Sequence, residues 1–338
     1  MADTPDRPRR RGLSRRSMLA GAAAAGVAAP VVVAGLGTAS ASPETSRPAR
    51  AGVTRRVTVY AEELGGGQFG YGLSPGTATI PGPVLEVYEG DTLEIDLVNN
   101  TDRRLSIHPH GVDYDVDSDG SPLNDSFNEP GTRRTYVWKT RAPFQKDGRW
   151  MPGSAGYWHY HDHAMGDDHG SGGILAGLYG ALIVRREGDL LPQRQYTVVF
   201  NDMTINNRVA PDIPVIEANQ GERVEFIAIG HGNTFHTFHL HAHRWVDNRT
   251  GMLSGPDDLT PSIDNRDLNP GDSFGFQVIA GEGVGPGVWM YHCHVQFHSV
   301  GGMAAVWLVR NPDGSMPDGA QEALDRYQAH EHSSHAGH

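Results

Sequence analysis

The stretch from Trp289 to Met303 constrains the fold more than any other part of this sequence. It reads WMYHCHVQFHSVGGM and holds the only cysteine of the chain together with three histidines and a methionine. In a β-strand, successive side chains point to opposite faces. A strand here therefore places Cys293 on one face and His292 and His294 on the other, so that one strand serves two sites placed back to back.

The Cys293 face offers the donors of a soft metal site. His298 and Met303 follow Cys293 at five and ten residues and could return to it through a loop. A thiolate, imidazole and thioether set suits copper in a blue electron-transfer site, with the methionine as a weak axial ligand. The alternative is a buried free cysteine among scattered histidines. A zinc site would normally recruit more cysteines.

An export signal is predicted at residues 1–41. A basic stretch ends at Arg15-Arg16, an apolar run follows from Ala20 to Leu36, and Ala39-Ser40-Ala41 has the small residues of a cleavage site. The pattern Ser-Arg-Arg-x-x-Leu resembles a twin-arginine signal, and a transmembrane anchor is the alternative. We therefore expect a secreted protein in which residues 42–52 link the signal to the fold.

Composition points to an acidic all-β protein. The chain has 338 residues with 43 glycines and 22 prolines, which favour short strands joined by turns. Its net charge is −12, and an acidic surface argues against nucleic acid and anionic membrane as partners. A single cysteine excludes an internal disulfide even in an oxidising location. A metal ligand is therefore the better reason for it.

The sequence from Val53 onward contains one pattern twice. The segments Val87–Leu97, His108–Gly111 and Gly156–His163 recur 131 positions later as Ala218–Ala228, His239–Ala242 and Gly287–His294. One constant offset over three segments indicates two copies of one β-domain, at 53–187 and 188–310. A His-rich flexible tail is expected at 311–338. Cys293 corresponds to Asp162 in the first copy, so only the second copy can build the thiolate site.

Four His-x-His pairs supply imidazoles for a second kind of site. They are His108/His110, His161/His163, His239/His241 and His292/His294. Residues i and i+2 of a strand share a face, so each pair offers two imidazoles to one place, with two pairs in each domain. Eight imidazoles exceed the needs of one ion and suit a cluster of several copper ions. His236 lies three residues before His239, and this odd spacing turns it toward the Cys293 face as a further ligand there.

The chain resembles a known family in these motifs. His-x-His-Gly, His-x-x-His-x-His and His-Cys-His-x-x-x-His-x-x-x-x-Met, as they stand here, look like those of the multicopper oxidases, and the two-domain length is similar to that of the small bacterial laccases. The resemblance implies an all-β fold of two cupredoxin-like Greek-key β-sandwich or barrel domains. It also implies about four copper ions per chain, one of type 1, one of type 2 and two of type 3.

The same resemblance assigns the ligands. The type 1 copper would be held by His236, Cys293, His298 and Met303. His108 and His239 would hold the type 2 copper. The type 3 pair would be held by His110, His161, His163, His241, His292 and His294.

Two further residues of the first domain are candidates for roles in the reaction. Asp119 resembles the acidic residue near the type 2 copper and would assist the proton uptake that oxygen reduction needs. Tyr114 is a candidate redox-active neighbour. The sequence Asp-Ser-Asp-Gly around Asp119 is also ordinary turn chemistry.

The remaining histidines are expected outside the ligand set. His159 shares a face with His161 and His163, but the repeat and the family register favour the latter two as ligands. His169, His231 and His243 fit no motif position and are expected at the surface or behind the ligands.

The implied reaction is that of a laccase, which takes single electrons from phenolic or aromatic-amine donors and reduces dioxygen to water. A metallo-oxidase for cuprous or ferrous ions would keep the same ligands, although the chain lacks a methionine-rich segment near them. A copper nitrite reductase has the same two-domain plan but does not need four His-x-His pairs. A copper store or electron carrier has no use for a cluster. Since each domain carries half of the cluster histidines, the resemblance implies a homotrimer closed head to tail, with clusters between chains.

Overall fold

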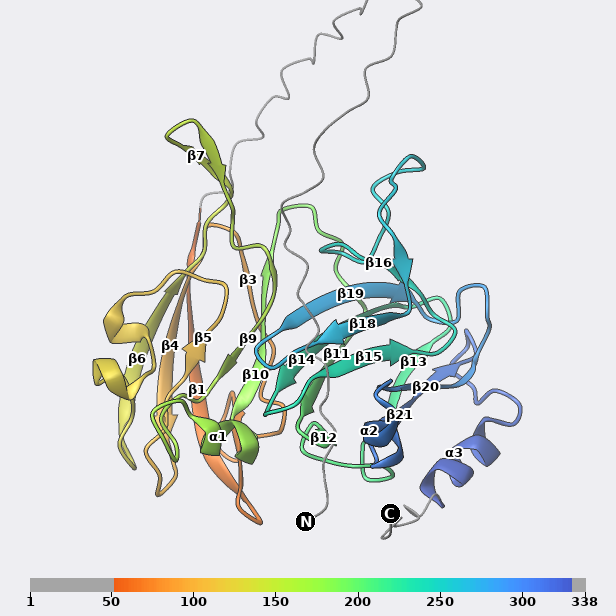
Figure 1. Ribbon diagram of the computed structural model, residues 1–338, viewed down its shortest axis with the longest axis horizontal. Helices are drawn as coiled ribbons and strands as arrows, with labels where there is room; N and C mark the ends of the chain where they lie inside the picture. The colour runs from red at the N-terminus through yellow and green to blue at the C-terminus, as the bar shows by residue number, and fades with distance from the viewer. Residues whose placement is uncertain (1–51, 330–338) are drawn as a thin grey trace, which may run out of the picture. The chain divides into compact units, whose positions relative to one another are not determined.

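The computed structural model describes residues 52–329, which form two β-sandwiches (Figure 1). The predicted export signal at 1–41 and the end of the predicted tail, from residue 330, lie outside the described residues. Strands β1 to β10 build the first sandwich and strands β11 to β21 build the second. The domain boundary at residues 187 and 188 stays a prediction, and it falls between β10 and β11.

The first sandwich packs a sheet of order β2-β1-β4-β6 against a sheet of order β3-β10-β9-β5. The first sheet contains β1 (Thr54–Gly65), β2 (Gln68–Gly72), β4 (Thr92–Asn99) and β6 (Arg133–Lys139). The second contains β3 (Leu85–Tyr88), β5 (His108–Pro109), β9 (Gly156–His161) and β10 (Tyr179–Arg185). The connections hold a hairpin of β7 (Phe144–Lys146) and β8 (Arg149–Met151), and the short helices η1 (Val116–Ser118), η2 (Pro122–Asn124) and α1 (Ser171–Ala176).

The second sandwich repeats this plan with a sheet of order β12-β11-β14-β19 and a sheet of order β13-β21-β20-β15-β18. The first of these contains β11 (Arg194–Asn201), β12 (Thr204–Ile205), β14 (Arg223–His231) and β19 (Ser273–Ile279). The other contains β13 (Ile216–Asn219), β15 (His236–Leu240), β18 (Asn265–Leu268), β20 (Gly287–Cys293) and β21 (Ala304–Arg310). The pair β16 (Trp245–Val246) and β17 (Ser262–Ile263) and the helices α2 (Gln296–Val300) and α3 (Ala320–Gln328) complete it.

Sequence alternation accounts for the strands. In β4, Leu93, Ile95 and Leu97 are buried while the residues between them are half-buried, and each such side chain contributes about 1.5–3 kcal/mol by leaving water. The turns that enter β4 and β14 place Gly90 and Gly221 at φ values of 93° and 91°, where glycine alone is unstrained. The repeated sequence thus becomes the same turn and the same strand in both sandwiches.

Helix α3 corrects one expectation. The chain from residue 311 was expected to be a flexible tail, yet Ala320–Gln328 is helical. Ala320 and Tyr327 are seven residues apart, which puts them on one helix face. Ala320 is buried, and the Tyr327 hydroxyl donates to the Ile213 carbonyl at 3.4 Å. Tyr327 packs on the core of the second sandwich, and this contact orders the helix.

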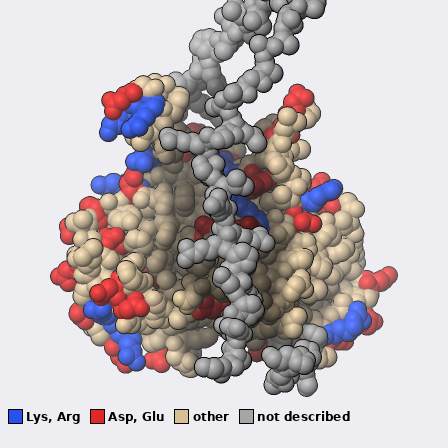
Figure 2. Space-filling model, viewed as in Figure 1, with Lys and Arg blue, Asp and Glu red and all other residues tan. Residues whose placement is uncertain are grey.

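No helix within residues 52–329 combines the length and the apolar character that crossing a bilayer requires. Acidic and basic side chains are interspersed over the face of the described residues shown in Figure 2, without a continuous basic surface.

The two sandwiches share an apolar contact. Tyr157 and Ile183 of the first sandwich pack with Val199, Ile227 and Ile229 of the second in one buried cluster. The contact therefore covers the outer face of β9 and β10 with the outer face of β11 and β14.

A buried polar network crosses the same contact. Arg185, 2% exposed, makes two hydrogen bonds of 2.8–2.9 Å to Glu225, which is fully buried. The Tyr157 hydroxyl and the Gln277 amide also donate to Glu225, at 2.6 and 2.9 Å. Burial by itself would raise the pKa of Glu225, but these donors, Arg185 above all, hold it below its usual value. Both charges are therefore present and compensated.

We expect Arg185→Met to destabilise the protein by about 3–5 kcal/mol, because it leaves the Glu225 carboxylate buried without its partner. Urea unfolding of the purified variant measures the loss. Arg194→Met is the matched control, since it removes an exposed ion pair with Glu222 and should cost less than about 1 kcal/mol. Equal losses in the two variants would contradict a special role for the network.

Candidate metal centres

Cys293 lies at the centre of a buried donor set. It ends β20, while His236 begins β15 and His298 lies on α2. Its Sγ is 3.7 Å from His236 Nδ1 and 3.4 Å from His298 Nδ1, and all three side chains are fully buried. The predicted odd spacing from His239 thus does bring His236 to the cysteine face.

Met303 belongs to the same buried core cluster as Cys293. Its carbonyl accepts the Cys293 N–H at 3.1 Å, and its own N–H donates to the His298 carbonyl at 3.0 Å. The loop through α2 therefore returns to the strand, as the sequence spacing predicted. Thiolate, imidazole and thioether donors in one dry place fit copper better than harder metals.

Burial determines the protonation of this set without metal. It lowers the pKa of His236 to about 4 and also lowers that of His298. It raises the pKa of the Cys293 thiol. At neutral pH the two imidazoles are therefore uncharged and the sulfur carries its proton.

A second donor set lies at one end of the first sandwich. One ring nitrogen from each of His108, His110 and His161 falls within 4.8 Å of the others. His110 Nε2 is 3.1 Å from His161 Nε2. The ring of His163 lies beside that of His108, with centroids 5.1 Å apart.

A third set in the second sandwich has the same arrangement. It groups His239, His241 and His292, and His241 Nε2 is 3.2 Å from His292 Nε2. The ring of His294 lies 5.2 Å from that of His239. Within residues 52–329 the second and third sets are separate groups, each half of the predicted cluster.

Hydrogen bonds prepare these imidazoles as ligands. His161 Nδ1 lies 2.7 Å from the Asp162 carbonyl and His292 Nδ1 lies 2.9 Å from the Cys293 carbonyl. A carbonyl only accepts, so Nδ1 must carry the proton and Nε2 must present its lone pair. His108 and His239 are held in the same way by the carbonyls of Asp119 and Asp264. In the neutral form, each of these four imidazoles therefore has its lone pair on Nε2, the form that can bind copper.

Asp119 lies beside His108. Its Oδ1 is 3.6 Å from His108 Nδ1, and its Oδ2 accepts from Ser121 and Asn124. Burial raises its pKa, but these two donors outweigh burial and the net pKa is lowered. The ring of Tyr114 meets that of His108 edge-on at 5.7 Å, and burial raises the pKa of its phenol.

Two further residues lie beside the cluster histidines: Asp264, which the sequence analysis did not name, and His231, which it expected at the surface or behind the ligands. Asp264 holds His239 as Asp119 holds His108, with Oδ1 at 3.9 Å from Nδ1, but no motif marks it. His231 ends β14 in the second sandwich and yet lies beside His159 and His161 of the first, with ring centroids at 5.0 and 5.5 Å. His231 thus lies behind the histidine rings, one of the two positions expected from the sequence, and the contact between the sandwiches brings it there.

His159 is absent from the three donor sets, as are His163 and His294, so its place outside the ligand set stays a prediction. It is 1% exposed and stacks on His110 at 3.9 Å. Both of its ring nitrogens are buried without a hydrogen-bond partner among the described residues. It therefore supports a ligand ring by packing.

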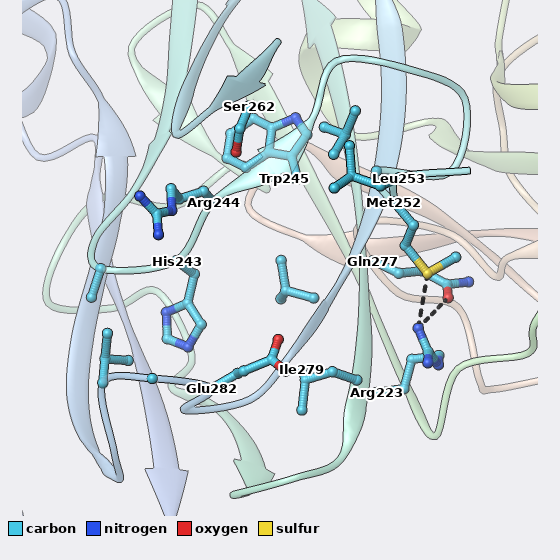
Figure 3. A pocket seen from close by; sticks show the side chains of 16 residues that line it. Arg223, His243, Arg244, Trp245, Met252, Leu253, Ser262, Gln277, Ile279 and Glu282 are labelled. Carbon is cyan, nitrogen blue, oxygen red and sulfur yellow. Dashed lines mark hydrogen bonds between the residues drawn. The ribbon is translucent and has the colours of Figure 1, made fainter. Parts of the chain in front are cut away.

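His243 and His169 also lie outside the donor sets. His243 is buried, and its Nδ1 and Nε2 bond the His241 carbonyl and the Gly281 N–H at 3.0 and 2.9 Å. Figure 3 shows it on the wall of a cleft of about 570 Å³, opposite Arg223. His243 thus braces the segment that carries His241, whereas His169 is exposed.

Comparisons with known proteins agree with this geometry. Two family models, both described as multicopper oxidase, match residues 77–189 and 188–313. A probable nitrite reductase-hydroxylamine oxidoreductase fusion protein of Kuenenia stuttgartiensis is 33% identical over 71% of this chain and 29% of its own length. The ferroxidase HEPHL1 of Mus musculus is 25% identical over 70% of this chain and 23% of its own length.

A similar fold occurs in the copper nitrite reductase from Nitrosomonas europaea, with a TM-score of 0.57 and 20% identity over 78% of this chain and 98% of that one. This chain spans less than a third of the length of the two curated relatives. It belongs to the multicopper oxidase family, and its domains are cupredoxin-like β-sandwiches, as the sequence predicted.

Copper binding at the Cys293 set should release about one proton at neutral pH, because the thiol must ionise while the imidazoles are already neutral. Calorimetric titration of the metal-free protein in buffers of different ionisation enthalpy measures this number. Cys293→Ser removes the thiol and is the reference. A difference of about one proton between the two proteins is expected, and a difference of none, or of two or more, contradicts this protonation state.

Proposed function

We propose that this protein is a laccase-type copper oxidase that couples one-electron oxidation of phenolic or aromatic-amine donors to reduction of dioxygen to water. The observation that carries the proposal is the combination of one thiolate set with two separate imidazole sets in one chain. An electron carrier needs the first set alone. The two histidine sets argue for a multi-electron site beside it.

The proposed ligand roles follow the family pattern. The type 1 copper is assigned to the set of His236, Cys293, His298 and Met303. His108 and His239, each held by a carbonyl from an aspartate-bearing loop, are assigned to the type 2 copper. The type 3 pair is assigned to His110, His161, His163, His241, His292 and His294.

Copper in these places would supply the redox chemistry, taking electrons singly and delivering them to dioxygen. The chain supplies the route, because Cys293 is covalently continuous with His292 and His294. A hydrogen bond from His292 Nδ1 to the Cys293 carbonyl provides a second connection between these two residues. Asp119 lies close enough to His108 to help hold a proton near that imidazole, and Tyr114 borders the same ring.

The surface beside the thiolate set suits aromatic donors. Phe297 is 66% exposed and its ring lies 4.2 Å from that of His298. Phe235, next to His236 in the chain, is 56% exposed. Exposed rings beside the ligands can stack on an aromatic donor, which favours phenols and aromatic amines.

Metal-ion oxidation is the second candidate, because relatives with the same domains include a ferroxidase. It would use the same sites and a different donor surface. Steady-state turnover of a phenol, compared with turnover of cuprous and ferrous ions, separates the two. Nitrite reduction is the third candidate and draws on the structural neighbour, but it leaves most of the eight imidazoles without a role.

Cys293→Ser should abolish the intense blue absorption and phenol oxidation, because the thiolate is the source of that band. The two histidine sets should still bind copper, which a metal count and spin-resonance spectra would record. Met303→Leu is the matched control in the same core cluster. It should keep the colour and raise the reduction potential, since only a weak thioether donor would be lost. Blue colour in the serine variant would contradict the assignment.

We further propose that the working unit is a homotrimer whose clusters lie between chains, the second donor set of one chain meeting the third set of the next. Each set is incomplete alone, and a head-to-tail contact closes into a ring. The protein is proposed to act outside the cytoplasm, after export directed by residues 1–41.

Complementation tests the arrangement. His110→Ala and His292→Ala should each be inactive alone, because each breaks one half of every cluster. When the two variants are assembled together, some junctions pair two intact halves, and phenol oxidation should return to a measurable fraction of the wild-type rate. Mixed oligomers that form and stay inactive would contradict clusters between chains.

A further inference from the structure

A groove of about 690 Å³ lies directly beside the third donor set. Its floor is the outer face of β20 and β21, with Val288, Met290 and Val306, and its walls are α2 and α3. His292, one of the cluster histidines, lines the same groove. The groove is therefore continuous with the half-cluster.

The repeat indicates that this face is built to be covered. Val288 and His292 correspond to Tyr157 and His161 at the offset of 131. In the first sandwich, Tyr157 is buried against the second sandwich of the same chain. In the second sandwich, Met290 is 38% exposed and Val300 on α2 is 63% exposed. An apolar surface of this kind beside a metal half-site marks an interface.

The second sandwich of the same chain covers one side of the first half-cluster, and the other side is left open. His231 and Tyr179 lie against each other at 5.4 Å between ring centroids, and His231 touches His159 and His161. The second sandwich therefore closes that side within the chain. On the other side, next to His108, lies the segment 114–124 that contains Tyr114, η1 and η2.

Residues 114–124 present exposed apolar and acidic side chains that could fit the groove. Leu123 is 90% exposed and Val116 is 63% exposed, although both are apolar. Asp115 and Asp117 make no ion pair within the described part of the chain, and neither does Arg326, which lines the groove. Apolar side chains and charges on the two surfaces are thus complementary.

We propose that residues 114–124 of one protomer bind in the groove between β20, β21 and α3 of the next, with Leu123 on the apolar floor and Asp115 and Asp117 facing Arg326. The inference rests on the proposed cluster between chains, and it names the contact that holds the two halves together.

Leu123→Asp tests the apolar part. Sedimentation of the copper-loaded protein should show that the dissociation constant of the oligomer rises about tenfold or more, the effect of burying a charge at an interface centre. Leu259→Asp is the control, because Leu259 is 94% exposed and lies outside the groove. Blue absorption retained in both variants shows that the Cys293 site is folded. Equal assembly of the two variants would overturn the contact.

Charge reversal tests the polar part. Arg326→Asp, and separately the pair Asp115→Arg with Asp117→Arg, should each weaken assembly, because like charges then face each other. The three changes together should restore assembly to within about threefold of the wild type. Absence of rescue overturns the contact even when the wild type is an oligomer with complete clusters. A wild-type monomer that binds a complete cluster would overturn both this contact and the cluster between chains.

Discussion

The alternation of side chains at the end of β20 is the constraint on which both kinds of site depend. Cys293 is fully buried and faces the core, whereas His292 and His294 face outward to the half-cluster. The pairing of β15 with β20 sets Phe238 opposite Cys293 and His239 opposite His292. A slip of one residue would send every one of these side chains to the other face. The register of two strands therefore builds the thiolate set and the imidazole set in one step.

Backbone carbonyls then give the imidazoles their chemical state. Four cluster histidines have Nδ1 against a carbonyl, so their Nε2 lone pairs are fixed before any metal arrives. The carbonyl partners of His161 and His292 are Asp162 and Cys293, which occupy the same position in the two copies. The Asp162 carboxylate accepts N–H groups from Ser106 and Met165. At this position the first copy thus has a structural anchor and the second has the cysteine of the thiolate set, while the neighbouring histidine keeps the same contact in both.

The positions of the cysteine and of most histidines could be predicted from the sequence, because their spacing follows the period of a β-strand and of the internal repeat. The spacing of His236 from His239 predicted the strand face on which His236 lies, and the constant offset pointed to a histidine set in each sandwich. What escaped prediction depends on contacts between distant segments. His231 reaches His159 only through the packing of two sandwiches, and Asp264 reaches His239 through the pairing of β15 with β18. Helix α3 was not predicted because its nine residues are too few to signal a stable helix by themselves. The contact of Tyr327 with the core of the second sandwich stabilises it instead.

The central claim is that one chain provides the ligands of a thiolate site and of a multi-copper cluster. A copper count on the purified protein, taken together with its optical and spin-resonance spectra, tests it most directly. We expect about four copper ions per chain, with separate signals for a blue site and for a site without thiolate. About two copper ions per chain, one at Cys293 and one isolated among histidines, would contradict it.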